Sequence, residues 1–223
     1  MSSPLIKYNN TTLVLPPAMC GSIGYYALLA SHKNVVIDRE CRFDKRRKLM
    51  HRYDIADVNG RLTLTVPIVK PRIGATWNEA EVSTHGAWWN IHKVALWSAY
   101  GRTPFFEYYI DEFMPYLRPR DDSQPESLMD LNMSINAIIR RILGIDSNIR
   151  YNLTDEEKEL IKTGDASIID HRSSNFDLEK WVEYYQVRAT QQGFIPNLTI
   201  LDLIFNMGPE SPLILKKLID IND

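Results

Sequence analysis

One histidine lies within the densest group of aromatic residues in the chain, between positions 88 and 109. By its i, i+3, i+7 and i+11 spacing, His92 shares one helix face with three further residues: Trp89, Leu96 and Tyr100. An imidazole titrates near pH 6.5, so a histidine that faces a pocket could act as a general acid or base, with Tyr100 contacting the substrate. The same spacing fits a hydrogen-bonded core histidine between aromatic rings. The pattern leaves both interpretations open.

Basic side chains gather upstream, where residues 39–52 hold seven Arg or Lys in 14 positions. Lys45 and Arg52 come shortly before a predicted strand, and cations there could hold a phosphate or carboxylate through charge-assisted hydrogen bonds. His51 is a second candidate general base. The alternative is a solvated basic loop, and we interpret the three basic residues at 46–48 as solubilising.

A carboxylate interrupts the apolar run NLTILDLIFNMG at 197–208. An unpaired carboxylate at Asp202 would be costly there, so it requires a hydrogen-bonding partner or water. Asp202 and Asn206 therefore predict either a hydrogen bond between helices or the lining of a pocket. In the second case Asp202 would share proton transfer with His92.

The overall composition is typical of a globular protein, with 44% hydrophobic residues and a net charge of -2. This balance gives no bulk attraction to nucleic acid or to an anionic membrane, so neither is an expected partner. The start of the chain lacks the features of a signal peptide, and no window approaches 18 consecutive apolar residues. Cys20 and Cys41 form neither a zinc motif nor a disulfide framework. We therefore expect a cytoplasmic protein.

Motifs for cofactors and metals are absent from the sequence. The loop GSIG at 21–24 lacks the GxGxxG spacing, and we interpret Gly21 and Gly24 as turn glycines. No helix pairs His with a carboxylate at metal spacing, and no GxSxG elbow occurs. We predict no cofactor and no metal site.

The elements that would position these residues change character along the chain. Apolar runs predict strands near 13–16, 34–38, 53–58 and 62–69, with short additions at 79–83 and 148–151. Helical periodicity and capping signals predict helices over 87–101, 104–117 and 125–143, and a further helix that starts at Thr154. Three more helices are predicted within 178–187, 197–208 and 212–220. The stretch 163–175 is expected to be irregular. The fold class is therefore α/β: an N-terminal mixed sheet with flanking helices and a helical C-terminal half, in one domain over 1–223.

Four blocks of the sequence, in this order, resemble the WbqC-like protein family. They are LVLPPAMCGSIGYYALLASHKNVVID, FDKRRKLMHRYDI with NGRLTLTVPIV, WWNIHKVALWSAYGRTPFFEYY, and GFIPNLTILDLIFNMGPES. Lys45 and Arg52 match basic positions of the family, whereas Leu15 and His51 stand where many members carry Gln and Asn. The resemblance implies a role in the biosynthesis of bacterial surface polysaccharide, including O-antigen, or of a related small molecule.

Two function hypotheses follow. The first is a group-transfer enzyme (acyl, aminoacyl or glycosyl) that acts on a small molecule bearing a phosphate or carboxylate. Its candidate catalytic residues are His92, Asp202 and His51. Its candidate substrate-binding residues are Lys45, Arg52, Tyr100, Tyr185, Gln186 and Asn206. Of these, Tyr185 and Gln186 resemble a Tyr-x-Gln-like feature of the family. The second is a non-catalytic binding or assembly protein that docks with pathway enzymes, or with a second copy, through an aromatic surface. A shared cavity would favour the first and a flat exposed aromatic patch the second.

Overall fold

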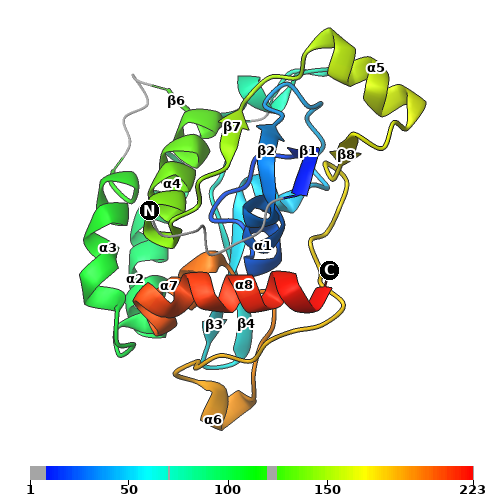
Figure 1. Cartoon of the computed structure of the whole chain (residues 1–223). Coiled ribbons are helices and arrows are strands. Elements are labelled where there is room, and N and C mark those ends of the chain that lie inside the picture. Colours follow the sequence, from blue (N-terminus) through cyan, green and yellow to red (C-terminus); the bar gives the residue numbers. More distant parts are fainter. Residues whose placement is uncertain (1–8, 70, 120–124, 223) are drawn as a thin grey trace.

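Four parallel strands form the larger sheet of the computed structural model, which describes residues 9–69, 71–119 and 125–222 (Figure 1). The strands are β1 (Asn9–Leu15), β2 (His32–Ile37), β7 (Asn148–Arg150) and β8 (Ile168–Asp170). They lie in the order β7-β2-β1-β8. Successive connections thus run from β1 out to β7 and then return to the other side of β1. This reversal makes the gap between the carboxyl ends of β1 and β8 a topological switch point, where ligands of open α/β sheets bind.

Strand β1 is covered on both faces, which explains its run of apolar residues. Leu13 and Leu15 belong to the main hydrophobic core, whereas Val14 belongs to a smaller cluster on the opposite face. Helix α5 (Asp155–Thr163) packs on that cluster through Leu160. Successive residues of the strand therefore point to opposite faces, and helices bury both.

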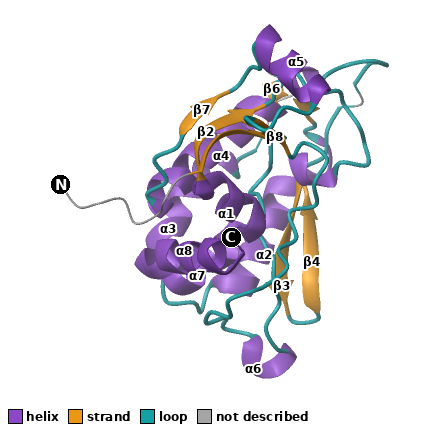
Figure 2. Ribbon diagram, turned by 45° about the vertical axis from the view of Figure 1, so that its right-hand side comes forward, coloured by secondary structure: helices purple, strands orange, loops and turns teal. Residues whose placement is uncertain are grey.

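The second sheet is an antiparallel hairpin of β3 (Arg52–Asp57) and β4 (Gly60–Thr65), which stands apart from the parallel sheet in Figure 2. The α/β fold class is confirmed, but the four early strands do not form one mixed sheet. Strands β7 and β8 pair with the outer edges of β2 and β1. The free edge of β3 instead receives the backbone N–H of Thr199 at the Asp54 carbonyl, at 2.8 Å.

The remaining elements are short strands and helices. The third sheet pairs β5 (Glu81–Val82) with β6 (Glu126–Ser127). Besides α5, the helices are α1 (Ile23–Ser31), α2 (Trp88–Tyr100), α3 (Phe106–Phe113), α4 (Leu128–Leu143), α6 (Ala189–Gln192), α7 (Ile200–Met207) and α8 (Ser211–Asn222). Short 3-10 turns lie at η1 (Lys48–Met50), η2 (Trp77–Glu79), η3 (His85–Ala87), η4 (Met114–Tyr116) and η5 (Gly208–Glu210). The helix predicted from Thr154 is confirmed as α5, which begins with a capping box of Thr154 and Glu157. The region after β7 is mostly helical, as expected.

Two local predictions were wrong. The stretch 163–175, expected to be irregular, contains β8, because Ile168 is buried and its short strand completes the edge of β1. Residues 178–187, expected to be helical, contain no helix. There Tyr184 and Gln186 are buried and Tyr185 between them is exposed, a period of two that turns alternate side chains inward.

Nothing in the described part of the chain forms a helix both long and apolar enough to cross a membrane. Residues 1–8, on which the expectation about export signals rests, lie outside the described residues.

Candidate functional site

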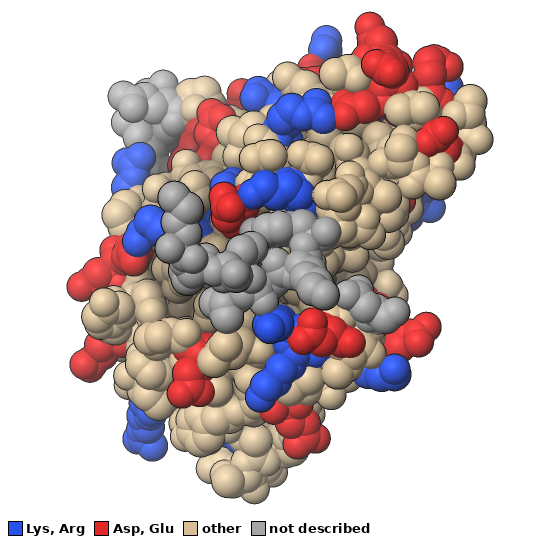
Figure 3. Space-filling view, in the orientation of Figure 1, with Lys and Arg blue, Asp and Glu red and all other residues tan. Residues whose placement is uncertain are grey.

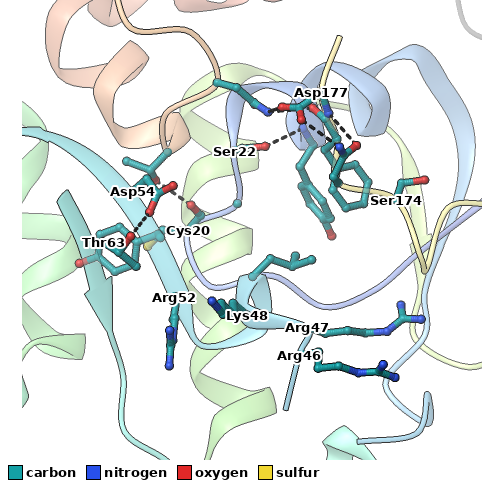
Figure 4. Close-up of a pocket in the computed structure, with 18 of the residues that line it drawn as sticks. Cys20, Ser22, Arg46, Arg47, Lys48, Arg52, Asp54, Thr63, Ser174 and Asp177 are labelled. Atoms are coloured by element: carbon teal, nitrogen blue, oxygen red, sulfur yellow. Dashed lines mark hydrogen bonds between the residues drawn. The ribbon is translucent and has the colours of Figure 1, made fainter. Parts of the chain in front are cut away.

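A cavity of about 750 Å³ lies at the topological switch point. Residues 20–22, which follow β1, and residues 172–177, which follow β8, form part of its wall (Figure 4). The segment 46–49 and inward-facing residues of the β3–β4 hairpin close the remainder. Its volume falls within the range of small-molecule sites, roughly 300–1,000 Å³. The fold therefore supplies a cavity where the strand order predicts one.

The wall of this cavity is rich in cations. Six basic residues line it, against the two carboxylates of Asp54 and Asp177: Arg46, Arg47, Lys48, Arg52, Arg61 and Arg172. Elsewhere charges of both signs are interspersed, as on the face shown in Figure 3. The chain has a net charge of -2, so the basic excess is local to the cavity. A cavity lined by charges of one sign attracts ligands of the opposite sign.

Three of these cations are held by carboxylates. Arg172 contacts Asp38 at 2.6 Å and Asp170 at 2.7 Å, both at the carboxyl ends of parallel strands. Arg61 pairs with Asp54 at 3.1 Å. These contacts fix the positions of the two guanidinium groups beside the cavity, while Arg46 forms an exposed pair with Asp44 at 3.0 Å.

The other three cations, Arg47, Lys48 and Arg52, form no ion pair with any carboxylate in the described ranges. The Nε atom of Arg52 is buried and has no hydrogen-bond partner among the described residues. A buried polar atom without a partner is uncommon and costs free energy, which an anion in contact with the guanidinium group would recover. The cavity thus presents donors with unused hydrogen-bonding capacity.

Backbone contacts explain why these cations face the cavity. They belong to the 3-10 turn η1 and its flanks, and Met50 in that turn is fully buried. The Met50 carbonyl accepts a hydrogen bond from Asn132 at 2.8 Å, and the Leu49 carbonyl accepts one from the Met19 N–H at 2.9 Å. With the backbone anchored on both sides, Arg47 and Lys48 are directed away from the core. In Figure 4 the Arg46 and Arg47 side chains extend side by side along this wall.

The first two backbone amides of α1 are not available to a ligand. The Ile23 N–H donates to the Leu198 carbonyl at 2.9 Å, and the Gly24 N–H donates to Asn197 Oδ1 at 3.0 Å. Gly24 lies inside α1, so its interpretation as a turn glycine was wrong, and neither Gly21 nor Gly24 has a positive φ. Both are required for packing, since a Cβ at Gly24 would lie 2.1 Å from the Phe176 carbonyl oxygen.

Cys20 also lines the cavity, but its thiol is a poor nucleophile. Burial raises the pKa of Cys20 well above its usual range, so the reactive thiolate is scarce at neutral pH. Among the described residues, no group of three or more His, Cys, Asp or Glu side chains could hold a metal ion.

His92 lies behind the cavity wall and does not line the cavity. Its Nε2 contacts the Thr65 carbonyl at 3.1 Å, and its Nδ1 contacts the Tyr53 hydroxyl at 3.0 Å. Because a carbonyl can only accept, Nε2 carries the proton and Nδ1 accepts from Tyr53. Burial lowers the pKa of His92 to about 4, so the ring is neutral at physiological pH. Both nitrogens are engaged, as in a structural histidine, and Tyr53 and Thr65 connect it to the cavity.

The contact between Tyr53 and His92 provides a direct test of this assignment. Replacing Tyr53 by Phe leaves the buried Nδ1 without its donor, and we expect the free energy of unfolding to fall by about 1–2 kcal/mol. Urea unfolding at pH 7, followed by circular dichroism, measures this loss. A Tyr53→Phe variant as stable as the native protein would contradict a structural role for the pair.

Asp202 lies in a second buried polar cluster, also outside the cavity. Its Oδ2 accepts from the Tyr184 hydroxyl at 2.5 Å and from Gln186 Nε2 at 3.0 Å, and the Tyr100 hydroxyl lies close enough to interact with the same carboxylate. Burial raises the pKa of Asp202 to about 6 despite these donors. The side chain of Asn206 continues the cluster by donating to the Asp202 carbonyl and accepting from the Val187 N–H.

The remaining predicted residues lie apart from the cavity. Tyr100 is fully buried beside the Asp202 cluster, and its hydroxyl accepts from the Ala56 N–H at 3.2 Å. His51 donates from Nδ1 to the Val66 carbonyl at 3.1 Å, and burial lowers its pKa. Lys45 and Tyr185 are exposed and do not line the cavity. Of the nine residues predicted for a site, the structure places only Arg52 in the cavity wall.

Several residues of the cavity wall were missed by the sequence analysis. Residues 46–48 were interpreted as solubilising, yet all three line the cavity. Arg172 lies in the stretch 163–175 that was expected to be irregular, and Asp177 was assigned no role. One signal could have identified Arg172: it follows the short apolar run at 168–169, and residues after parallel strands meet at one edge of a sheet.

The fold and the cavity define the chain as an α/β protein with a basic ligand-sized cavity at the carboxyl ends of its parallel strands. It belongs to the WbqC-like protein family, whose family model matches residues 17–171. No curated protein and no solved structure matches the chain significantly. The matched range includes the basic turn and the β3–β4 hairpin, but the resembling block at 193–211 and the cavity residues from Arg172 onward lie beyond it.

Proposed function

We propose that this protein binds a small molecule bearing a phosphate or carboxylate group in the switch-point cavity, and that it is a group-transfer enzyme acting on that molecule. The observation that carries the proposal is the set of three cations without carboxylate partners, within the described ranges, on one wall: Arg47, Lys48 and Arg52. Guanidinium groups bind carboxylates and phosphates in bidentate geometry, and partial burial strengthens such contacts. Acyl, aminoacyl and glycosyl transfer all use substrates of this charge.

Proton transfer in the proposed reaction requires a group that reaches the cavity. Asp54 and Asp177 do so, and each already accepts hydrogen bonds: Asp54 from the Thr63 hydroxyl at 2.6 Å and Asp177 from Asn197 at 2.7 Å. A carboxylate oxygen has capacity for further donors, so either side chain could orient or deprotonate a substrate hydroxyl. His92 reaches the cavity only through Tyr53 and Thr65, so its proposed role becomes the positioning of the Tyr53 phenol.

The family context supports a biosynthetic role. The resemblance to WbqC-like proteins suggests that the molecule belongs to bacterial surface polysaccharide synthesis, including O-antigen, or to a related pathway. We propose no cofactor, and we propose that a pathway enzyme or a second copy of the chain is a partner.

The second candidate function is non-catalytic assembly through an aromatic surface. Trp97 and Tyr108 have exposed fractions of 47% and 75%, and Ile91 and Val94 on the outer face of α2 are exposed as well. Large apolar side chains on a surface can mark a protein contact. However, the other aromatic residues between positions 88 and 109 are buried or partly buried, so the exposed area is smaller than the sequence suggested.

Arg52→Gln provides the test of the proposed function. Loss of a charge-assisted contact is expected to weaken anion binding by about 1.5–3 kcal/mol, or roughly 10- to 100-fold in Kd. Isothermal titration with inorganic diphosphate, nucleotide sugars and acyl-coenzyme A measures the affinity. Lys45→Gln is the matched control, because Lys45 belongs to the same basic segment but does not line the cavity. Equal effects of the two substitutions, or no binding by the native protein, would reject the proposal and favour assembly.

A further inference from the structure

A second cavity of about 600 Å³ adjoins the first. The two share part of their wall: Arg46, Arg47, Arg172 and Ser173 line both. Each cavity is much larger than a phosphate group alone requires. A ligand that used only the shared wall would leave most of both volumes without contacts.

The shared wall is built to hold negative charge in a fixed place. Arg172 is anchored by two carboxylates, and Arg47 Nη2 donates to the Ser173 hydroxyl at 2.9 Å. Arg46 lies beside Arg47 and is oriented by Asp44 (Figure 4). Three guanidinium groups in one strip extend further than a single phosphate needs, and the N–H groups that are not bound to carboxylates match the greater length of a diphosphate.

The parts of the cavities beyond the shared wall offer different chemistry. The first contains the rings of Tyr25 and Phe176, with centroids 5.1 Å apart, and the hydrogen-bonding side chains of Asp54, Thr63 and Asp177. Such groups suit a polar organic group that carries hydroxyls.

The second cavity is lined away from the shared wall by Cys41, Arg42 and Phe43, together with two carboxylates that already pair with arginines. The Phe43 ring packs against Trp77 at a centroid distance of 4.4 Å, so this wall is fixed by the core. It combines an aromatic ring with charged side chains, and the cavity is large enough for a second organic group.

We propose that the ligand is a diester of diphosphate, in which the diphosphate lies on the shared arginine wall and one organic group enters each cavity. The inference rests on the proposed function and deepens it by specifying the class of ligand. A monoester would leave one cavity unused, and a carboxylate would not use all three guanidinium groups.

Calorimetric titration with three probes tests the inference: inorganic diphosphate, UDP and UDP-glucose, which carry zero, one and two organic groups. We expect affinity to rise along this series, by about tenfold or more between the first and the last. If inorganic diphosphate binds as tightly as UDP-glucose, the diester is rejected while the anion site stands. If none of the three binds, both proposals fail together.

Variants distinguish the three regions. Arg47→Gln, in the shared wall, should weaken all three probes by about tenfold, because it removes a charge-assisted contact. Thr63→Val in the first cavity and Arg42→Gln in the second should each weaken UDP-glucose more than inorganic diphosphate. Lys45→Gln should change nothing, and thermal unfolding should verify that each variant is folded. Two-cavity binding is overturned if either Thr63→Val or Arg42→Gln leaves the affinity for UDP-glucose unchanged.

Discussion

Replacing Gly24 by alanine is expected to lower the free energy of unfolding by about 3 kcal/mol or more, a large part of the stability of an ordinary domain. The added Cβ would lie 2.1 Å from the carbonyl oxygen of Phe176, so backbone on one side must move. The same shift would weaken the hydrogen bonds that Asn197 makes to the Gly24 N–H and to the Phe176 carbonyl. Since residues 172–177 form one side of the cavity, the variant should also bind its ligand less tightly.

Gly164→Ala is the control for this prediction. Gly164 has a φ of 70°, and no atom of the described residues lies within 4 Å of the place that a Cβ would occupy. The cost of this substitution is therefore conformational alone, about 1 kcal/mol. Urea unfolding followed by circular dichroism compares the two variants. The close approach of α1 to the 172–177 segment would be refuted if Gly24→Ala lost no more stability than Gly164→Ala.

Strong local patterns made much of the fold predictable. The apolar runs around Val14 and Val36 predicted β1 and β2, and the dipeptide Asn59-Gly60 between the predicted strands at 53–58 and 62–69 is typical of the tight turn that joins β3 and β4. The sequence could not show that the hairpin leaves the parallel sheet, because that depends on which distant segments reach the strand edges. Strand β8 has three residues, too few to show a period, and it is stabilised by pairing with β1.

The candidate site was less predictable than the fold. Arg52 was identified because it comes at the start of a strand in a basic segment, but that pattern does not distinguish a solvated charge from one facing a cavity. The difference between Lys45 and Lys48 arises from the anchoring of Leu49 and Met50 by residues far along the chain. His92 and Asp202 were predicted as site residues because they are titratable side chains within apolar segments. In the structure both are buried in the core.

These two buried groups affect stability with opposite dependence on pH. The pKa of His92 falls to about 4 on folding, so the unfolded chain binds the extra proton and stability is lost as pH decreases from 6.5 toward 4. The pKa of Asp202 rises to about 6, so the folded chain binds the extra proton and stability is lost as pH increases from about 4 to 6. In the native protein the two effects offset each other over this range. A substitution that removes one of the two titratable groups should therefore reveal the pH dependence that the other contributes.

Asp202→Asn is accordingly expected to gain stability relative to the native protein as pH rises from about 4 to 6, by about 3 kcal/mol across that range. The neutral amide can still accept from Tyr184 and Gln186, and the penalty for a buried charge disappears. Any effect of the Asp202→Asn substitution that does not involve proton binding changes the free energy of unfolding by the same amount at every pH. The decisive quantity is therefore the slope of the stability difference, obtained from urea unfolding at several pH values between 4 and 8.

Asp165→Asn supplies a control of opposite sign. Hydrogen bonds from Ser167 lower the pKa of Asp165, so its contribution to stability is present above the ordinary aspartate pKa and is lost as pH falls. The difference between that variant and the native protein should thus become less favourable only as pH rises through the acidic range below about 4, and it should stay flat between pH 4 and 8. A flat difference for Asp202→Asn between pH 4 and 6 would show that Asp202 is not held in the buried cluster with a raised pKa. Tyr184 and Gln186 bind the Asp202 carboxylate in the same buried place that raises its pKa. Without a raised pKa, the cluster could therefore not be the buried contact between α7 and the extended segment 184–187.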